Sequence, residues 1–465
     1  MIRAASVVCT LLLAASSFAF STPATMRLDY FHTGNAKQEM FSVDRVVIEP
    51  LPWPGDLTKT LDNSNSGAYF FEVRDRSNGK ILYSRGFSSI YGEWVTTGEA
   101  ARMNRTYSES LRFPAPTSPV HVVLKARRNG VFQEVWGTDI DPADKFIDRS
   151  KPVPPIPVLE LQKSGDPSTK VDLLILGDGY TAAELSKFEN DARRFLKILF
   201  STEPFRTHQQ DFNIWGLCPP AAETGISRPS TGIHRRNPIG TTYDTFDSER
   251  YILTSDNRAL RDLASYAPYE FIEILANNDT YGGGGIFNLY ATVAADSDWA
   301  AYVGVHEFGH HFAGLADEYY TSDVAYTSAA KRSEPWEPNV TALLDTATLK
   351  WNDLVGPGTP LPTPWHKKQF ESYEHEIQSR RRAIRAAGRP EAEMNQLFRE
   401  EKLQGDELLK SEQFSGKVGA FEGANYEAQG YFRPEVNCIM FTRHDAFCAV
   451  CRRALERIIA MYSTQ

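Results

Sequence analysis

Two of the ten histidines are spaced as ligands of one metal ion. His306 and His310 are four positions apart, so on an α-helix their imidazoles project from the same face, one turn from each other. Glu307 follows the first histidine, where its carboxylate can take a proton from a metal-bound water and return it to a leaving amine. This H-E-x-x-H pattern predicts a catalytic Zn²⁺ ion that activates water for hydrolysis.

A third ligand is expected shortly after these histidines. Gly314 is predicted to end the helix, because glycine can adopt a left-handed cap that redirects the chain towards the ion. We favour Asp317 as the third ligand, since its short side chain suits so close a turn, and Glu318 is the alternative. His311 lies about 100° round the helix from its neighbour His310, so we interpret it as a packing or supporting residue. Three protein ligands leave room for water, whereas a structural zinc site is closed by four.

A helix must present these side chains, and the flanking sequence predicts one. We expect it to begin near residue 300, with Ser297 or Asp298 as its N-cap. The apolar run 286–293 predicts a β-strand before it, which the chain enters through four glycines at 282–285. That glycine run is typical of a loop that is either mobile or closely approached by other backbone.

The surrounding chain predicts a mixed α/β domain over residues 170–465. Buried strands are expected at three places: residues 171–177, 212–217 and 271–276. Thr181 begins a helix through a capping box with Glu184, and strands interleaved with helices are typical of such a domain. A block rich in Glu, Lys and Arg at 366–412 predicts two charged amphipathic helices, which we interpret as an insertion.

Residues 22–149 predict an all-β module of the sandwich type. Pairs of β-rich runs flank Asn78-Gly79 and Asn129-Gly130. Asn-Gly between such runs is a strong hairpin signal, because both central residues of a type I′ turn need a positive φ. We interpret the module as an accessory domain. The proline-rich residues 150–169 follow it as an extended linker.

The N-terminus predicts export. Residues 1–19 combine one early positive charge, an apolar run and small residues before Ala19, as in a signal peptide cleaved near that residue. The apolar run is shorter than the ~20 residues of a membrane-spanning helix, so a retained membrane anchor is the less favoured alternative. We expect a periplasmic, cell-surface or secreted protein without a membrane segment after cleavage.

Four cysteines follow the predicted signal peptide: Cys218, Cys438, Cys448 and Cys451. Because disulfides persist in an oxidising compartment, the sequence predicts a local bridge from Cys438 to Cys448 or Cys451. The Cys448-x-x-Cys451 pair leaves a redox pair or half of a zinc site as alternatives.

Three segments resemble the IgA-peptidase family of metzincin-like zinc metallopeptidases: Val305–Tyr319, Val418–Ala424 and Cys438–Met440. The resemblance spans roughly Val171–Tyr462, and the preceding module resembles the N-terminal module that accompanies this family. It implies a metzincin-like fold, a catalytic zinc ion and hydrolysis of peptide bonds.

The metzincin pattern also assigns roles within the motif. Met440 matches the methionine of the Met-turn, which in metzincins lies beneath the metal site. Against that pattern, the glycine and the third ligand each come one residue later, at Gly314 and Asp317.

Composition bounds the partners. The chain has 465 residues with 50 basic and 59 acidic side chains, a net charge of −9, so a nucleic-acid surface is not expected. We predict an exported zinc-dependent endopeptidase for a protein or peptide substrate, with Glu307 as general base and then general acid. The alternatives are a zinc amidase acting on cell-wall peptides and a non-catalytic surface or periplasmic binding protein with a structural metal. Four residues are candidate donors to a developing oxyanion: Tyr319, Tyr320, Tyr431 and His444.

Overall fold

The computed structural model describes residues 22–322 and 332–464. The predicted signal peptide, residues 1–19, lies outside these ranges. Within them, no helix has both the length and the hydropathy needed to cross a bilayer.

The N-terminal region is all-β apart from one short helix, α1 (Ile90–Trp94). One antiparallel sheet has the strand order β2-β1-β5 and the other has the order β4-β3-β6-β7. The strands are β1 (Ala24–Gly34), β2 (Glu39–Pro52), β3 (Tyr69–Asp75), β4 (Ile81–Phe87), β5 (Arg105–Pro114), β6 (Val120–Arg128) and β7 (Val131–Ile140). Leu28 of the first sheet and Val122 of the second are fully buried in one shared core, so the two sheets pack face to face.

The hairpin between β6 and β7 has the turn that its sequence predicts. Asn129 and Gly130 both have a positive φ, 51° and 81°, as a type I′ turn requires. In the hairpin between β3 and β4, only Gly79 of the Asn-Gly pair does so. That turn is therefore of another type.

The rest of the chain forms a mixed α/β region around a six-stranded sheet of order β12-β13-β11-β9-β10-β8. The strands are β8 (Leu159–Gln162), β9 (Val171–Asp178), β10 (Phe212–Leu217), β11 (Phe271–Ala276), β12 (Gly283–Ile286) and β13 (Tyr290–Ala294). The four inner strands are parallel and the two edge strands are antiparallel to their neighbours. The predicted mixed α/β class is thus confirmed, together with an all-β N-terminal region.

Two segments differ from their predicted form. Leu159–Gln162 falls in the predicted linker 150–169 yet forms β8, which pairs with β10 at the edge of the sheet. The predicted single strand at 286–293 is a hairpin of β12 and β13, reversed around Asn288, whose φ is 55°. The glycines at 282–285 are therefore mostly strand rather than loop. The sequence did not predict this strand, because glycines have no side chains to show the alternation that marks one.

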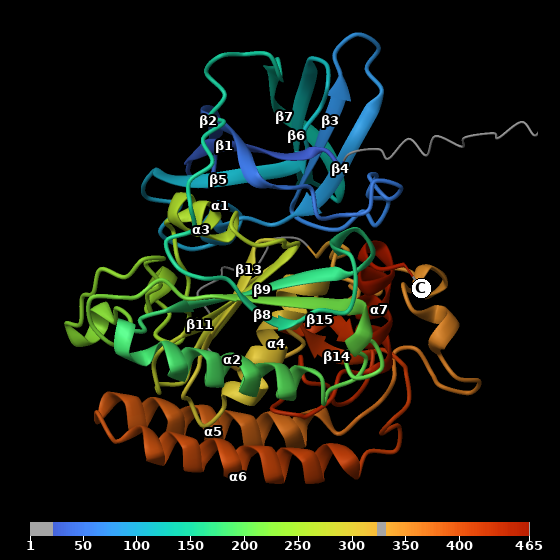
Figure 1. Ribbon diagram of the computed structural model, residues 1–465. Coiled ribbons are helices and arrows are strands. Elements are labelled where there is room, and N and C mark those ends of the chain that lie inside the picture. Colours follow the sequence, from blue (N-terminus) through green and yellow to red (C-terminus); the bar gives the residue numbers. More distant parts are fainter. Residues whose placement is uncertain (1–21, 323–331, 465) are drawn as a thin grey trace, which may run out of the picture.

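Helices cover both faces of this sheet (Figure 1). One face packs on α2 (Leu185–Leu199), α4 (Ala300–Ala313) and α7 (Ala449–Tyr462). The other packs on α3 (Asn257–Ala264) and on the N-terminal region. Alternate residues of β9 serve the two cores: Leu173 and Ile175 face α4, while Leu174 and Leu176 face α3.

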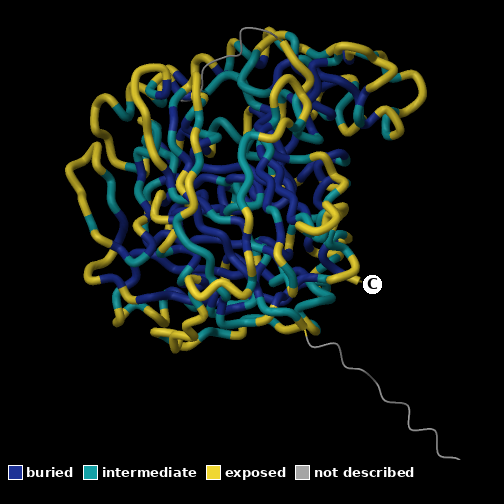
Figure 2. Tube along the Cα trace, turned by 90° about the horizontal axis from the view of Figure 1, so that it is seen from above, coloured by how far each residue is buried: buried dark blue, intermediate teal, exposed yellow. Residues whose placement is uncertain are grey.

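A pair of long helices occupies the charged segment 366–412. They are α5 (Lys367–Ala386) and α6 (Glu391–Lys410), and a hairpin of β14 (Phe421–Ala424) and β15 (Glu427–Arg433) follows them. The pair forms an outer layer at the opposite end of the molecule from the N-terminal region (Figure 1). Phe370 and Phe398 anchor it in the core of the α/β region. Seen from above, buried chain lies in the middle of the molecule and exposed loops lie around it (Figure 2).

The starts of two helices have different caps. The last helix begins at Ala449, where the Cys448 side chain accepts from the amide of Cys451 and so caps it. Helix α4 has Trp299 at its N-cap position, and Ser297 instead accepts from the amide of Trp299 (3.3 Å). Short 3₁₀ turns lie at Pro167–Thr169, Ala182–Glu184, Gln209–Asp211, Pro229–Thr231, Thr245–Asp247, Thr346–Thr348 and Asn352–Leu354.

Candidate metal centre

Helix α4 presents the two spaced histidines and ends where the sequence predicts. Gly314 caps it in the left-handed region with φ 60°, and the chain then turns back towards the helix. Edge strand β12 lies against α4 so closely that a Cβ on Gly285 would stand 2.2 Å from the carbonyl oxygen of Glu307. The glycine run is thus closely approached backbone, which fixes α4 against the sheet.

Three ligand atoms converge at the end of α4. Nε2 of His306 and Nε2 of His310 are 3.1 Å apart, and Oδ1 of Asp317 lies 3.0 Å from the first and 3.2 Å from the second. Three ligands held ~2.0–2.1 Å from a tetrahedral zinc ion would be about 3.3 Å apart. The triangle therefore has the size that one zinc ion needs.

The hydrogen bonds of the two imidazoles leave these nitrogens without protons. Nδ1 of His306 donates to the carbonyl of Ile439 (2.9 Å), and Nδ1 of His310 donates to the carbonyl of Leu315 (2.5 Å). A carbonyl oxygen only accepts, and a neutral imidazole has one N–H. Both Nε2 atoms consequently point lone pairs at each other and at a carboxylate oxygen, an arrangement that a cation stabilises.

Asp317 is held in place by its other oxygen. Oδ2 accepts from the hydroxyl of Tyr426 (2.5 Å), whereas Oδ1 is buried without a hydrogen-bond donor. A buried carboxylate oxygen without a partner is costly, and the ligand position explains it. The donor set, two imidazoles and one carboxylate with a fourth position left to water, is that of a catalytic zinc site.

Electrostatics separate the roles of the two carboxylates. Burial, opposed by the two histidines, raises the pKa of Glu307 above its ordinary value, which suits a group that must accept a proton near neutral pH. Burial disfavours the charge on Asp317, yet His310 and His306 outweigh it and hold its pKa well below the usual range. Without a metal, Asp317 outweighs the burial of His310 and raises the pKa of that imidazole to about 9. The ligand triangle therefore favours a positive charge, which a metal ion supplies in place of the proton on His310.

Met440 lies directly under the helix. Its sulfur would stand 3.3 Å from a Cβ on Gly309, and its carbonyl accepts from the amide of Glu318 (2.8 Å). The preceding residue, Ile439, accepts from His306. The loop around Met440 thus supports the ligand His306 and the ligand-bearing turn, in both cases through a backbone carbonyl.

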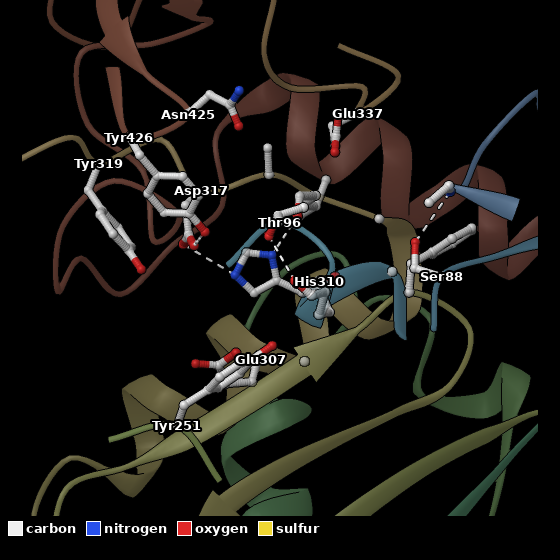
Figure 3. Close-up of a pocket in the computed structure, with 18 of the residues that line it drawn as sticks. Ser88, Thr96, Tyr251, Glu307, His310, Asp317, Tyr319, Glu337, Asn425 and Tyr426 are labelled. Atoms are coloured by element: carbon white, nitrogen blue, oxygen red, sulfur yellow. Dashed lines mark hydrogen bonds and ion pairs between the residues drawn. The ribbon is translucent and has the colours of Figure 1, made fainter. Parts of the chain in front are cut away.

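A cavity of about 670 Å³ opens onto this site. Glu307, His310 and Asp317 lie along it, and Ser88 and Thr96 of the N-terminal region face the same space (Figure 3). The cavity therefore lies between the N-terminal region and the α/β region, and both shape what can reach the ligand triangle.

Family models match both regions. The model described as IgA Peptidase M64 matches residues 159–459. The chain belongs to the IgA peptidase M64 family. A second model, Peptidase M64 N-terminus, matches residues 17–136, and no curated protein matches the chain. The family resemblance of the sequence is thus confirmed, and the protein is a peptidase.

Two histidines that the sequence analysis singled out in this M64 peptidase, His311 and His444, lie outside the site. His311 is fully buried on the other side of α4, where Nε2 accepts from the amide of Ile272 and Nδ1 donates to the carbonyl of Ile286, each at 3.1 Å. Burial lowers its pKa to about 3, so it is a neutral packing residue. His444 instead pairs with Asp406 at 3.3 Å and does not line the cavity.

Of the three tyrosines proposed as oxyanion donors, two line the cavity and one does not. Tyr319 and Tyr431 line the cavity, whereas Tyr320 stacks on Phe441 away from it. Tyr319 is placed by Arg250, which donates to its hydroxyl at 3.1 Å. Arg250 is a residue of the M64 site that sequence reasoning missed, because it lies in an irregular stretch without any periodic signal.

Tyr426 was missed for the same reason. It lies in the turn between β14 and β15, with a φ of 64°, and only the fold brings it to Asp317. The segment Val418–Ala424 that resembles the family immediately precedes it, so that match was the one available signal.

The predicted disulfide is absent among the described cysteines, which are all free and buried. The sulfurs of Cys438 and Cys451 are 3.8 Å apart, nearly twice the ~2.05 Å of a disulfide bond. The alternative third ligand, Glu318, points away from the histidines and into this group of cysteines.

Proposed function

We propose that this M64 protein is an exported zinc-dependent endopeptidase in which His306, His310 and Asp317 hold one zinc ion. The observation that carries the proposal is the convergence of the Nε2 atoms of two imidazoles and an unpartnered carboxylate oxygen within 3.0–3.2 Å of one another. Zinc, when bound, supplies a Lewis acid that polarises the scissile carbonyl and acidifies a water molecule.

Glu307 is proposed as general base and then general acid. It follows the first ligand on α4, lies along the cavity and has a pKa raised by burial. Its carboxylate takes a proton from the attacking water and passes it to the leaving amine. Tyr319, held by Arg250, is the best-placed hydroxyl to donate to the developing oxyanion.

A metzincin-like arrangement is supported by the loop beneath α4. Met440 lies under Gly309, and its neighbour Ile439 fixes the ring of His306. The one-residue displacement of Gly314 and Asp317 from the metzincin pattern does not prevent the carboxylate from reaching both histidines.

The test of the reaction is Glu307→Gln, with Glu376→Gln on the exposed side of α5 as the control. We expect the first variant to keep its zinc and to lose activity by about 10²–10⁴-fold on an unfolded protein substrate, because only the proton transfer is removed. The control keeps full activity. Zinc content by mass spectrometry and peptide-bond cleavage by chromatography are measured together, and unchanged turnover in Glu307→Gln would contradict the mechanism.

The test of export is the N-terminus of the mature protein. After expression with its native leader, we expect the protein in the periplasm, at the surface or in the medium, beginning within a few residues of Ala19. N-terminal sequencing of each cell fraction measures this. A cytoplasmic protein that still begins at Met1 would refute export while leaving the zinc site untouched.

A further inference from the structure

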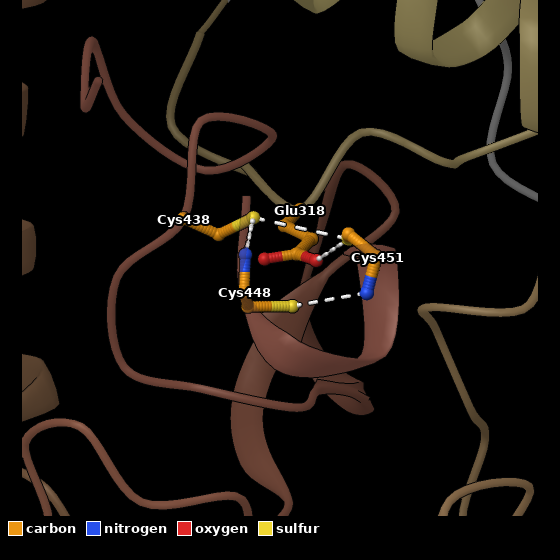
Figure 4. A group of neighbouring side chains, drawn as sticks. All are labelled: Glu318, Cys438, Cys448 and Cys451. Atoms are coloured by element: carbon orange, nitrogen blue, oxygen red, sulfur yellow. Dashed lines mark hydrogen bonds between the residues drawn. The ribbon is translucent and has the colours of Figure 1, made fainter. Parts of the chain in front are cut away.

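A second group of metal-ligating side chains lies behind the candidate metal centre. Glu318, Cys438, Cys448 and Cys451 place one ligand atom each within 4.8 Å of one another, and all four residues are buried. Figure 4 shows the four side chains pointing towards one another at the start of α7. None of them lines the cavity of the peptidase site.

Two separations among these atoms match edges of a zinc tetrahedron. Sγ of Cys438 and Sγ of Cys451 are 3.8 Å apart, and Sγ of Cys451 is 3.5 Å from Oε1 of Glu318. With Zn–S bonds of ~2.3 Å and a Zn–O bond of ~2.0 Å, the edges of a tetrahedron are about 3.8 Å between sulfurs and about 3.5 Å between sulfur and oxygen. Both observed separations match these edges.

The backbone around the sulfurs is arranged to stabilise thiolates. The amide of Cys448 donates to Sγ of Cys438 (3.3 Å), and the amide of Cys451 donates to Sγ of Cys448 (3.4 Å). Thiolates rather than thiols are the form that binds a metal.

Glu318 supplies the second independent observation. Its side chain is fully buried, Oε1 accepts from Asn339 (2.9 Å), and Oε2 has no hydrogen-bond partner. A buried carboxylate without full partners is expensive in an apolar core. A cation among the three sulfurs would offset the charge of this carboxylate.

A disulfide explains less of this arrangement. Joining Cys438 to Cys451 would require the two sulfurs to approach by nearly half of their separation, to ~2.05 Å. It would also leave the Cys448 thiol and the Glu318 carboxylate facing each other in the core. The buried guanidinium of Arg433, whose charge acts on Glu318, fits a site that carries net negative charge.

We propose that Glu318, Cys438, Cys448 and Cys451 form a structural zinc site closed by four protein ligands. Its donors are soft thiolates with one carboxylate, a set that binds zinc and leaves no position for water or substrate. The catalytic centre, by contrast, has three ligands from a different set of residues.

The position of this site gives it a role in the geometry of the peptidase. Glu318 follows the ligand Asp317 in the chain, and Cys438 precedes Ile439, which fixes His306. Cys448 and Cys451 belong to the first turn of α7. One ion would therefore tie the ligand-bearing turn, the loop beneath the histidines and the last helix together, as an outer support of the catalytic ligands.

The test counts zinc in the full-length protein purified without added chelator. We expect about two ions per chain in the wild type, about one in Cys451→Ser and about one in His310→Ala, because each variant removes a ligand of a different site. Cys218→Ser, another buried cysteine that lies away from the group, is the matched control and keeps two. Two ions in Cys451→Ser would overturn the proposal.

A measurement on the wild type covers the case in which Cys451→Ser does not fold. X-ray absorption at the zinc edge should show sulfur ligands, at an average of three sulfurs for every two zinc ions. Cobalt substitution should give thiolate charge-transfer bands. A single ion with nitrogen and oxygen ligands only, together with a mapped disulfide among these cysteines, would refute the structural site. The catalytic zinc site would stand in that event, since the loss of zinc in His310→Ala tests it separately.

Discussion

At the scale of single residues, the candidate centre depends on the hydrogen bonds that the ligand side chains make through their other polar atoms. The carbonyls of Ile439 and Leu315 accept hydrogen bonds from the Nδ1–H groups of the two ligand histidines. The Nε2 atoms of these histidines can therefore bind a metal. Tyr426 orients Asp317 in the same way, because its hydroxyl donates a hydrogen bond to Oδ2 and leaves Oδ1 for the ion. These three contacts orient the ligands before any metal binds.

Removing the tyrosine hydroxyl should therefore weaken zinc binding. In Tyr426→Phe, Asp317 keeps its position in the chain but loses the hydrogen bond that fixes its rotamer. We expect zinc affinity to fall by about 10–100-fold, the usual effect of removing such a support. Competition with a chromophoric chelator measures it.

The matched control for this prediction is Tyr431→Phe. Tyr431 lines the same cavity, but its hydroxyl accepts from the amide of Ser333 (3.3 Å) rather than contacting Asp317. Zinc affinity should be unchanged there. Equal loss of affinity in both variants would mean that the Tyr426 contact has no specific role.

At the scale of elements, the sheet beneath α4 carries a carboxyl group that no hydrogen bond satisfies. Glu273 lies in β11 between Phe271 and Leu275, at a position that faces α4 because side chains alternate along a strand. Both of its oxygens are buried and unpartnered. Burial, with Glu307 adding to it, raises the pKa of Glu273 well above the ordinary value.

Glu273→Gln should stabilise the protein in a pH-dependent way. In the native protein the folded form keeps a proton that the unfolded form releases above pH ~4.5, so stability falls as pH rises. The amide cannot ionise, so the advantage of the variant should grow by about 1.4 kcal/mol per pH unit above that value until Glu273 itself ionises. Thermal unfolding of both proteins from pH 4.5 to 8 measures the difference.

Glu376→Gln on the exposed side of α5 controls for the substitution itself. Its melting temperature should follow that of the wild type across the pH range. A difference between Glu273→Gln and wild type that does not change with pH would show that Glu273 ionises in the folded state, contrary to its burial.

The elements also show what sequence can and cannot predict. Strands β9, β10 and β11 have strongly apolar sequences, and their observed bounds fall within one residue of the predicted ones. The β12–β13 hairpin was predicted as one strand, since glycines carry no side chains from which a reversal could be read. Sequence periodicity reports burial along a single element but not the pairing of one backbone with another.

The residues of the candidate sites also differ in whether the local sequence predicts their positions. The spacing of His306 and His310 on one helix face is local, and the structure brings them together as the sequence predicts. The choice between Asp317 and Glu318 is not local, because consecutive side chains diverge and their partners lie more than a hundred positions further on, at Tyr426 and Cys451. No pattern within the turn contains that information.

At the scale of the whole molecule, the N-terminal region is docked on the α/β region as one wall of the cavity. Arg27 and Arg45 reach Asp262 of α3 at 2.5 and 2.6 Å, and the amide of Ser88 donates to the carbonyl of Phe287 (2.9 Å). Ser88 and Thr96 line the cavity. We expect a substrate long enough to extend from the ligand triangle to meet this wall, so the docking should affect how the substrate is held.

Arg112 is the residue through which to test that control. It lies in β5, donates to the carbonyl of Tyr269 (3.0 Å) and stacks 3.6 Å over the ring of that residue, while its other nitrogens bind Glu49. Arg112→Ala breaks the contact across the two regions and leaves a buried carboxylate short of one partner. We expect a loss of about 3–5 kcal/mol in the free energy of unfolding.

Activity should fall unequally in Arg112→Ala because the ligand triangle itself is untouched. Cleavage of long unfolded proteins should lose more kcat/KM than cleavage of short peptides that reach only the zinc site, and zinc content should stay constant. Arg105→Ala is the control, since Arg105 pairs with Glu99 at a half-exposed position within the N-terminal region and such pairs contribute about 0–1 kcal/mol. If Arg112→Ala unfolds at a lower temperature yet treats long and short substrates alike, the N-terminal region stabilises the peptidase without helping to hold its substrate.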